Sequence, residues 1–200
     1  MTKEPLLLAL DQGTSSSRAA VFNSKGKIIA SQSHPLQIEY PSDGWVQQNP
    51  IEILTSQLSA MAKLEKVLTA EQCNSIVSCG ITNQRETTIL WRRSSGNPCG
   101  KGIVWQDGRT TEICRKWKEE TDGADWEHRT GLLLDPYFSA SKIAWLLKHE
   151  EEALNANANL DLCFGTVESW LLWNLTEEKN HFSDMSNASR TLLMDIENLK

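Results

Sequence analysis

Short apolar runs separated by polar turns dominate the first third of the chain. Asn23-Ser24-Lys25-Gly26 is typical of a hairpin turn between two such runs. Because the runs are short, rich in branched or small apolar residues and bounded by turn residues, they are typical of strands rather than helices. The pattern predicts a β-meander with strands at residues 6–10, 19–22 and 27–32.

A helical spacing of apolar residues follows a loop that contains Pro35, Pro41 and Gly44. Asn49-Pro50-Ile51-Glu52 has the composition of a helix start, with Asn at the cap, Pro in the first turn and Glu three residues after the cap. Beyond it, apolar residues recur on one helix face at Ile51, Leu54, Leu58, Met61 and Leu68. We therefore predict a helix from residue 50 to about residue 69.

Strand-like and helix-like segments alternate through the rest of the chain. The polar segment 151–161 is interpreted as a helix end and connector, and residues 188–200 as a strand followed by the beginning of a further element. This alternation predicts a layered α/β domain. The predicted strands lie at 75–81, 87–91 and 103–105, and the predicted helices lie near 110–120, 140–150 and 166–175.

The composition excludes several classes of protein. The 200 residues suffice for one domain or a little more, and 40% hydrophobic and 23% charged residues are typical of a globular chain. A net charge of −6 argues against non-specific nucleic-acid binding. The apolar run 6–10 is too short for a membrane span or a signal peptide. Five cysteines without a C-x-x-C motif indicate neither a disulfide framework nor a zinc site, so we expect a cytoplasmic protein.

The sequence Asp11-Gln12-Gly13-Thr14-Ser15-Ser16-Ser17-Arg18 ends the first predicted strand. A glycine turn directs backbone N–H groups toward an anion, hydroxyl groups add donors, and the guanidinium of Arg18 suits phosphate oxygens. Asp11 suits Mg²⁺, which prefers few carboxylates and several waters. A polar hairpin turn without a ligand explains the same residues, so the local pattern leaves both interpretations open.

Asn83-Gln84-Arg85-Glu86-Thr87 follows the predicted strand 75–81. Neighbouring side chains on a regular strand point to opposite faces, so Arg85 and Glu86 reach one ligand only if the strand breaks there. A guanidinium donates and a carboxylate accepts, and together they satisfy the vicinal hydroxyls of a polyol. A solvated surface pair is the alternative, and the pentad alone favours it.

Aromatic residues supply the remaining candidates. Trp105 ends a predicted strand and offers a flat apolar wall, and Tyr137 lies where a loop enters a predicted helix, although packing alone explains each of them. Lys142 is interpreted as a helix-surface lysine. Neither the P-loop pattern nor G-x-G-x-x-G is present, so any nucleotide handling depends on the turn between Asp11 and Arg18.

In combination, these segments resemble the glycerol-phosphorylating branch of the FGGY family of carbohydrate kinases. The resemblance runs in order from residue 6 to the end of the chain, and NQRET is its most discriminating motif. One departure is Gly108, where the family usually has a bulkier residue, which puts the local loop shape in question. The matching stretches are LALDQGTSSSR, GWVQQNP, GITNQRETTILW, IVWQD, GLLLDPYFSASKIAWLL, FGTVESWLLWNLT and SDMSNASRTLLMDI.

The resemblance implies an actin-like, ribonuclease-H-like ATPase domain, with a mixed sheet flanked by helices. It places Thr14, Ser15, Ser16 and Arg18 at the phosphates of ATP, and Asp11 beside Mg²⁺, through water; Asp11 and Arg18 are thereby the catalytic candidates of this chain. It assigns the substrate-binding roles, the contacts with glycerol, to a second set of residues: Arg85, Glu86, Trp105 and Tyr137.

The implied reaction transfers the γ-phosphoryl group of ATP to glycerol, giving sn-glycerol 3-phosphate and ADP. The family's catalytic aspartate and its adenine-binding domain lie beyond residue 200, so we expect residues 1–200 to be an incomplete N-terminal domain that is inactive alone. We expect the intact protein to form a homo-oligomer. Alternatives are a kinase for another sugar or polyol, a truncated non-catalytic relative, or an actin- or chaperone-like ATPase, which NQRET disfavours.

Overall fold

The chain folds into two compact units. The structure, a computed structural model, describes residues 4–121 and 123–199. The first unit contains the residues up to Ile38 together with Ile51–Gln84, and the second contains Glu39–Pro50 together with the residues from Arg85 onward.

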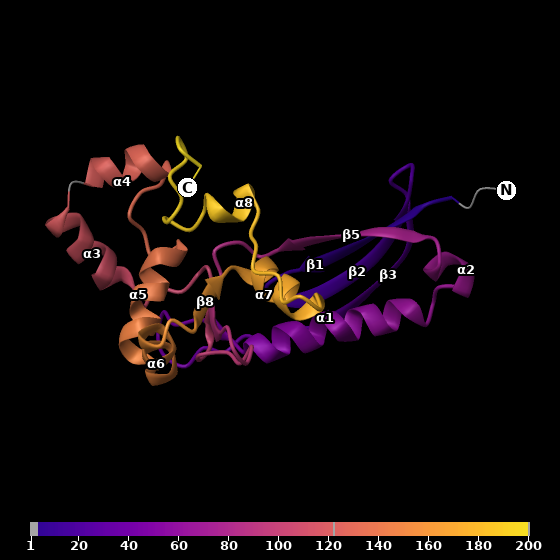
Figure 1. Cartoon of the computed structure of the whole chain (residues 1–200), viewed down its shortest axis with the longest axis horizontal. Helices are drawn as coiled ribbons and strands as arrows, with labels where there is room; N and C mark the ends of the chain where they lie inside the picture. The colour runs from indigo at the N-terminus through magenta and orange to yellow at the C-terminus, as the bar shows by residue number, and fades with distance from the viewer. Residues whose placement is uncertain (1–3, 122, 200) are drawn as a thin grey trace. The chain divides into compact units, whose positions relative to one another are not determined.

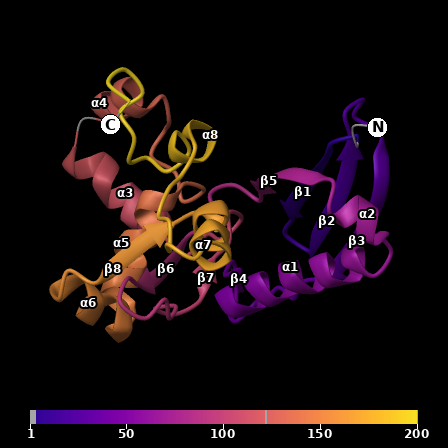
Figure 2. The ribbon, with the colours of Figure 1, turned by 45° about the vertical axis from the view of Figure 1, so that its right-hand side comes forward.

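The first unit is built on a four-stranded mixed sheet with the order β3-β2-β1-β5. The three strands β1, β2 and β3 form the predicted antiparallel meander, whereas β5 pairs with β1 in parallel. A parallel return needs a crossover connection, which α1 and α2 supply (Figures 1 and 2). The elements are β1 (Leu6–Gln12), β2 (Ser16–Asn23), β3 (Ile28–Pro35), α1 (Pro50–Glu65), α2 (Ala70–Cys73) and β5 (Ile76–Asn83).

Helix α1 packs on one face of this sheet. Ser17 Oγ on β2 lies 2.6 Å from Ser56 Oγ on α1, and Gln57 Nε2 donates to the Arg18 carbonyl oxygen at 3.2 Å. Side chains alternate along a strand, and Asp11 pairs with Arg18 while Gln12 pairs with Ser17. Gln12 and Ser17 consequently face α1, and Asp11 and Arg18 lie on the opposite face of the sheet.

The predicted end of α1 at residue 69 is wrong, because Thr69 begins a second helix. Thr69 Oγ1 accepts a hydrogen bond from the Gln72 backbone N–H, and Gln72 Oε1 accepts one from the Thr69 N–H. This reciprocal capping box starts the one-turn helix α2, and the long helix ends at Glu65. The predicted strand at 75–81 is confirmed as β5.

The second unit combines two short ribbons with six helices in the described part of the chain. β4 pairs with β7 and β6 pairs with β8, both antiparallel. The elements are β4 (Gln47–Gln48), β6 (Ile89–Arg92), β7 (Gly102–Ile103), α3 (Thr111–Glu120), α4 (Gly123–Thr130), α5 (Ser139–His149), α6 (Glu151–Ala158), β8 (Leu162–Gly165), α7 (Val167–Leu175) and α8 (Met185–Ala188).

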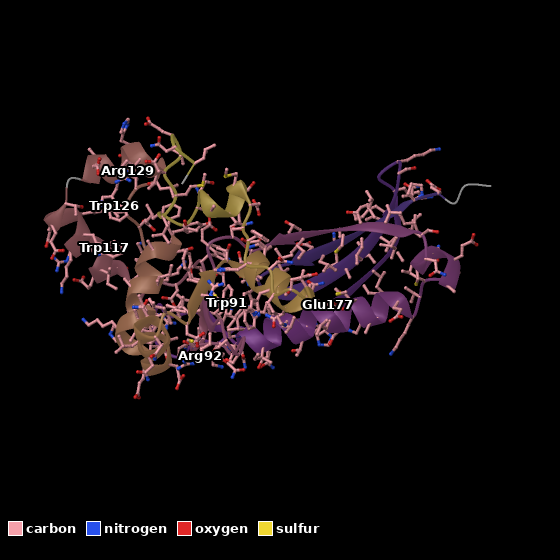
Figure 3. The ribbon with its side chains drawn as sticks, in the orientation of Figure 1. Trp91, Arg92, Trp117, Trp126, Arg129 and Glu177 are labelled. Atoms are coloured by element: carbon pink, nitrogen blue, oxygen red, sulfur yellow. The ribbon has the colours of Figure 1, made fainter. Side chains whose placement is uncertain are left out.

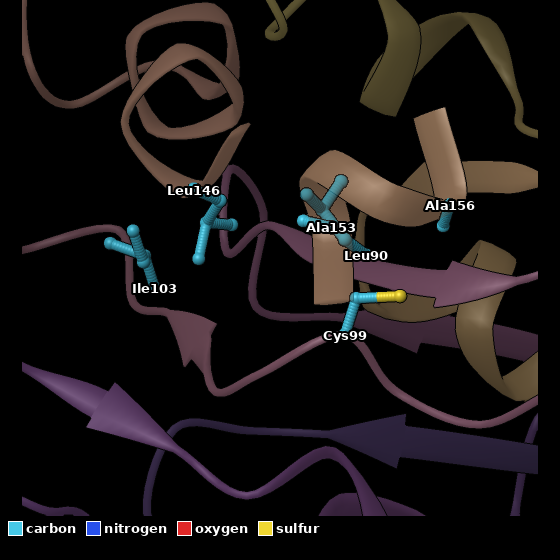
Figure 4. Close-up of a cluster of buried hydrophobic side chains, with 6 residues drawn as sticks. All are labelled: Leu90, Cys99, Ile103, Leu146, Ala153 and Ala156. Carbon is cyan, nitrogen blue, oxygen red and sulfur yellow. The ribbon is translucent and has the colours of Figure 1, made fainter. Parts of the chain in front are cut away.

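A core of buried apolar side chains joins the ribbons of this unit to α5 and α6. Leu90 on β6, Ile103 on β7 and Leu146 on α5 belong to it, and Ala153 and Ala156 contribute from α6 (Figure 4). The two alanines are fully buried, so α6 approaches the strands closely. Residues 151–161 are therefore not a connector: the polar composition concealed a helix that packs through two small side chains.

All eight tryptophans of the chain belong to the second unit. Trp91, labelled in Figure 3, is fully buried and packs against Trp170 and Trp173 with ring-centroid distances of 5.6 and 5.9 Å. Trp170 Nε1 also donates to the Pro50 carbonyl oxygen at 2.9 Å. These three tryptophans are therefore packing residues of the second unit. Tryptophan fluorescence of this chain reports on the second unit alone.

The strand predicted within residues 188–200 is wrong. Asp184 Oδ1 accepts hydrogen bonds from the Ser186 and Asn187 backbone N–H groups and caps α8, which ends at Ala188. Leu192 then adopts a φ of +61°, which interrupts any extended run. Leu192 and Met194 are nevertheless buried, so the apolar pattern marked packing residues correctly and their conformation wrongly.

Within the described residues, no helix combines the length and the apolar character that crossing a membrane requires.

A substitution at Gly165 tests the packing of α7 against β8. An added Cβ at Gly165 lies 2.5 Å from Ser169 Cβ and 3.1 Å from the Trp91 ring, whereas a Cβ at Gly108 meets nothing closer than 3.6 Å. We expect Gly165→Ala to lower the free energy of unfolding by about 1–3 kcal/mol through overpacking. Urea unfolding followed by tryptophan fluorescence measures the effect, with Gly108→Ala as the matched control. Equal midpoints for the two variants would contradict the prediction.

Candidate functional site

The turn after β1 is tight and depends on Gly13. The Gly13 backbone N–H donates to the Ser16 carbonyl oxygen at 2.9 Å, and an added Cβ at Gly13 lies 3.0 Å from that same oxygen. Glycine is therefore needed for space rather than for a left-handed backbone. Ser15 is exposed at this turn, and Thr14 and Ser16 are half-buried.

Ser17 has a structural role that its neighbours do not share. It is fully buried, donates to Gln12 Oε1 at 2.8 Å and contacts Ser56 Oγ. The Gln12 side chain in turn donates to the Gly13 carbonyl oxygen at 3.2 Å. This buried network fixes the base of the turn to the sheet and to α1.

Asp11 and Arg18 are direct neighbours across the β1–β2 ladder, and Asp11 also pairs with Thr82 across the parallel ladder. Directly opposed residues of an antiparallel pair share a face, with Cβ atoms about 4.5–5.5 Å apart. Asp11 is half-buried and Arg18 is exposed. The described residues contain no cluster of three or more His, Cys, Asp or Glu side chains suited to a metal ion. A single accessible carboxylate fits Mg²⁺ bound mainly by water and phosphate oxygens.

In the second unit, the backbone breaks at Glu86. This residue has a φ of +63°, and the Thr87 N–H donates to the Arg85 carbonyl oxygen at 2.8 Å. The expected strand break is confirmed, since β5 ends at Asn83. Arg85 is exposed but only 2% of Glu86 is accessible, so the interpretation of a solvated surface pair is wrong for Glu86.

The carboxylate of Glu86 is bound by Arg190, which lies 104 positions further along the chain. Arg190 Nε donates to Glu86 Oε1 at 2.7 Å, and the guanidinium lies 5.7 Å from the Tyr137 ring centroid and 4.9 Å from that of Phe138. Tyr137 and Trp105 form a T-shaped pair with centroids 5.7 Å apart. Trp105 also contacts the segment that follows Glu86, because its backbone N–H donates to Thr87 Oγ1 at 3.2 Å.

These contacts bring together Glu86, Trp105 and Tyr137, three of the four residues expected at a polyol. Arg85 is covalently adjacent to Glu86 and exposed. Sequence reasoning missed Arg190, although it lies within the SDMSNASRTLLMDI stretch that carried part of the resemblance. The phosphate-binding candidates belong to the first unit and the polyol-binding candidates to the second, so they form two separate groups of residues.

Lys142 is not the surface residue that its helical position suggested. It is fully buried, and its Nζ donates to the Tyr137 carbonyl oxygen at 2.6 Å and to the Glu86 carbonyl oxygen at 3.1 Å. Burial lowers the pKa of Lys142 to about 7, against the opposing influence of nearby acidic groups. These groups are Glu86, Asp107, Asp135 and Cys114.

Asp107 and Arg109 form a second buried pair. Their side chains are 0% and 3% exposed, and Arg109 Nη2 lies 2.8 Å from Asp107 Oδ2. The guanidinium contacts both Trp45 and Trp145, at 4.1 and 4.9 Å from their ring centroids. Asp107 Oδ2 also accepts a hydrogen bond from the Val46 backbone N–H. The pair therefore ties the loop after Trp105 to residues 39–50, and Gly108 between its members leaves room for a side chain.

The sequence matches one domain family over nearly its whole length. Residues 6–200 match the family described as "FGGY family of carbohydrate kinases, N-terminal domain". The glycerol kinase of Leptothrix cholodnii is 50% identical over 190 residues, which are 95% of this chain and 38% of that protein. The glycerol kinase of Staphylococcus epidermidis is 45% identical over 199 residues, with 98% and 39% covered.

Solved structures of kinases resemble the fold of this chain. Plasmodium falciparum glycerol kinase, crystallised with ADP, has a TM-score of 0.90 and 34% identity over 98% of this chain and 39% of its own. Gluconate kinase from Lactobacillus acidophilus has a TM-score of 0.85 at 18% identity, with 98% and 38% covered, and shows the fold alone. The expected fold, a mixed sheet flanked by helices in an actin-like ATPase domain, is confirmed. The chain spans 38% and 39% of the length of these curated relatives.

The lowered pKa of Lys142 generates a prediction about stability. The unfolded chain keeps a lysine pKa near 10.4, so between about pH 7 and pH 10 it binds the proton that the folded chain releases. Stability supplied by this residue therefore rises with pH across that window, by up to about 1.4 kcal/mol per pH unit.

Urea unfolding by tryptophan fluorescence at pH 7, 8 and 9 measures this slope, and Lys142→Met provides the reference. The buried Cys99, Cys114 and Cys163, whose pKa values are raised by burial, titrate in both proteins, so the difference between the two curves isolates Lys142. Parallel pH dependences for wild type and variant would show that Lys142 stays protonated.

Proposed function

This chain belongs to the FGGY family of carbohydrate kinases, and on that premise we propose that it forms the N-terminal part of a glycerol kinase. The whole protein transfers the γ-phosphoryl group of ATP to glycerol and releases sn-glycerol 3-phosphate and ADP. Residues 1–200 are the incomplete N-terminal domain, and they supply a phosphate-binding turn and a polyol-binding cluster. The catalytic base and the adenine site belong to residues beyond 200, as the resemblance implies.

The observation that carries the proposal is the cluster of Glu86, Arg190, Tyr137 and Trp105. A buried carboxylate accepts hydrogen bonds from hydroxyl groups, and neighbouring aromatic rings contact the C–H surface of a short carbon chain. Arg85, exposed beside Glu86, adds a donor fork. This combination suits a small uncharged polyol better than a phosphorylated sugar, because the carboxylate repels a phosphate.

The first unit supports the nucleotide half of the proposal. The turn at Gly13 presents Thr14, Ser15 and Ser16, and Arg18 offers a positive charge on the same face as Asp11. In phosphoryl transfer, catalysis consists mainly of positioning and of neutralising the charge that develops on the phosphoryl oxygens. Asp11 and Arg18 are the catalytic candidates: Asp11 holds Mg²⁺ through water, and Arg18 binds phosphate oxygens. Bound Mg²⁺ supplies further charge neutralisation.

The cellular setting is part of the same proposal. All five cysteines are free, and three of them are buried, which suits a reducing compartment. We place the protein in the cytoplasm, where it acts on glycerol, ATP and ADP, and we expect a homo-oligomer. Nucleic acid is not an expected partner, because the net charge is −6.

Rates across a substrate panel test the proposal. In the longer protein, we expect kcat/KM for glycerol to exceed that for xylulose, ribulose and gluconate at least tenfold, about 1.4 kcal/mol or more. A coupled ADP-release assay measures each rate. Comparable values across the panel would favour another sugar or polyol kinase. Residues 1–200 alone are the control, and we expect no glycerol-dependent ADP release from them; no activity in the longer protein either would favour a non-catalytic relative.

Arg85 is tested separately. If its guanidinium pairs with substrate hydroxyls, Arg85→Ala in the longer protein raises the glycerol KM and reduces kcat/KM by about 2–3 kcal/mol. Arg93→Ala is the matched control, since Arg93 is an exposed arginine of the same unit. Steady-state kinetics with glycerol as the varied substrate distinguish the two. Identical kinetic constants for both variants would return Arg85 to the class of surface residues.

A further inference from the structure

Lys142 is a buried basic residue that the proposed reaction does not use. It belongs to α5, in a helix whose other basic residues, Lys148 and His149, are exposed near its end. A lysine is almost never fully buried without partners. Here the partners are two backbone carbonyl oxygens from segments that lie 51 positions apart in the sequence, at Glu86 and Tyr137.

The first carbonyl belongs to the residue where the backbone breaks. Glu86 has a left-handed φ of +63°, which is uncommon for a residue other than glycine and persists only where its surroundings enforce it. Its carbonyl oxygen accepts hydrogen bonds from Lys142 Nζ and from Thr88 Oγ1, at 3.1 Å each. Its carboxylate is bound by Arg190. The direction of the carboxylate is therefore fixed from both ends of the residue.

The second carbonyl oxygen belongs to Tyr137, whose aromatic ring is part of the polyol-binding cluster. Tyr137 lies just before α5, where Phe138 at the N-cap makes no side-chain capping bond. The 2.6 Å bond from Lys142 Nζ holds the Tyr137 backbone against the following turn of the helix. The Tyr137 ring then contacts Trp105 and the guanidinium of Arg190. The amino group of Lys142 thus links the segment that carries the Glu86 carboxylate to the segment that carries the Tyr137 ring.

We propose that Lys142 is a positioning residue that sets the spacing between the Glu86 carboxylate and the Tyr137 ring, and thereby the affinity of the site for a three-carbon polyol. This inference rests on the proposed function. The amino group of Lys142 reaches two carbonyl oxygens at once, whereas a purely apolar side chain leaves both buried oxygens without this donor. The acidic groups facing it are Glu86, Asp107, Asp135 and Cys114.

Lys142→Met in the longer protein tests the proposal, because it keeps the apolar stem and removes every donor. We expect the glycerol KM to rise at least tenfold while the ATP KM stays within twofold of the wild-type value. Lys148→Met, on the exposed part of the same helix, should change neither constant. If Lys142 has a purely structural role, the result is different: the melting temperature and kcat fall, and the glycerol KM stays unchanged. That result would overturn the proposal.

Lys142→Gln covers the case in which Lys142→Met does not fold. The amide retains two donors, but its shorter side chain cannot reach both carbonyl oxygens, so we expect the glycerol KM to rise at least threefold; a wild-type KM would refute the positioning role. If the wild-type protein prefers another polyol, the glycerol assignment fails by itself, and the same KM comparison with that polyol decides the role of Lys142.

Discussion

The second unit depends on how one residue, Glu86, is held. A left-handed backbone at a glutamate and a carboxylate with 2% of its surface accessible are each unfavourable in isolation. Both persist because donors surround the residue: Lys142 and Thr88 bind its carbonyl oxygen and Arg190 binds its carboxylate. Since Lys142 comes from α5 and Arg190 from the segment after α8, the break brings distant parts of the chain to one place.

The turn at Gly13 and the cluster around Glu86 are stabilised in different ways. In the first unit, the ligand-facing groups are accessible, and the turn is rigid because Gly13 and the buried Ser17 network leave the backbone little freedom. Such a turn suits phosphates, because they are charged and hydrated and interact strongly with accessible donors. In the second unit, Glu86 is already desolvated and paired before substrate binds. Such an arrangement suits an uncharged polyol, whose hydroxyl groups offer weaker interactions and gain from preformed partners.

Much of the fold followed from local pattern. The meander, the start of α1 at Pro50 and the strand β5 were predictable because strand alternation, hairpin residues and helix caps are short-range signals. Two of the failed predictions had no short-range signal: the alanines of α6 replaced large apolar residues, and Leu192 left the extended conformation. The third failure overlooked one, because the capping box that begins α2 joins Thr69 and Gln72, which are only three positions apart. Among the site residues, Glu86, Trp105 and Tyr137 lie together, while Arg190 and Lys142 were missed.

The sequence by itself determined which residues are candidates for chemistry: the acid, glycine and hydroxyl groups around Gly13, the Arg85-Glu86 doublet, Trp105 and Tyr137. It could do so because residue type and spacing define donors, acceptors and turns. Tertiary structure alone decided which charges are buried and which partners they have. Lys142 and Lys148 are both lysines on α5, yet Lys142 is fully buried and Lys148 is exposed. The environment of a charge is set by segments far away in the sequence, and no local pattern encodes it.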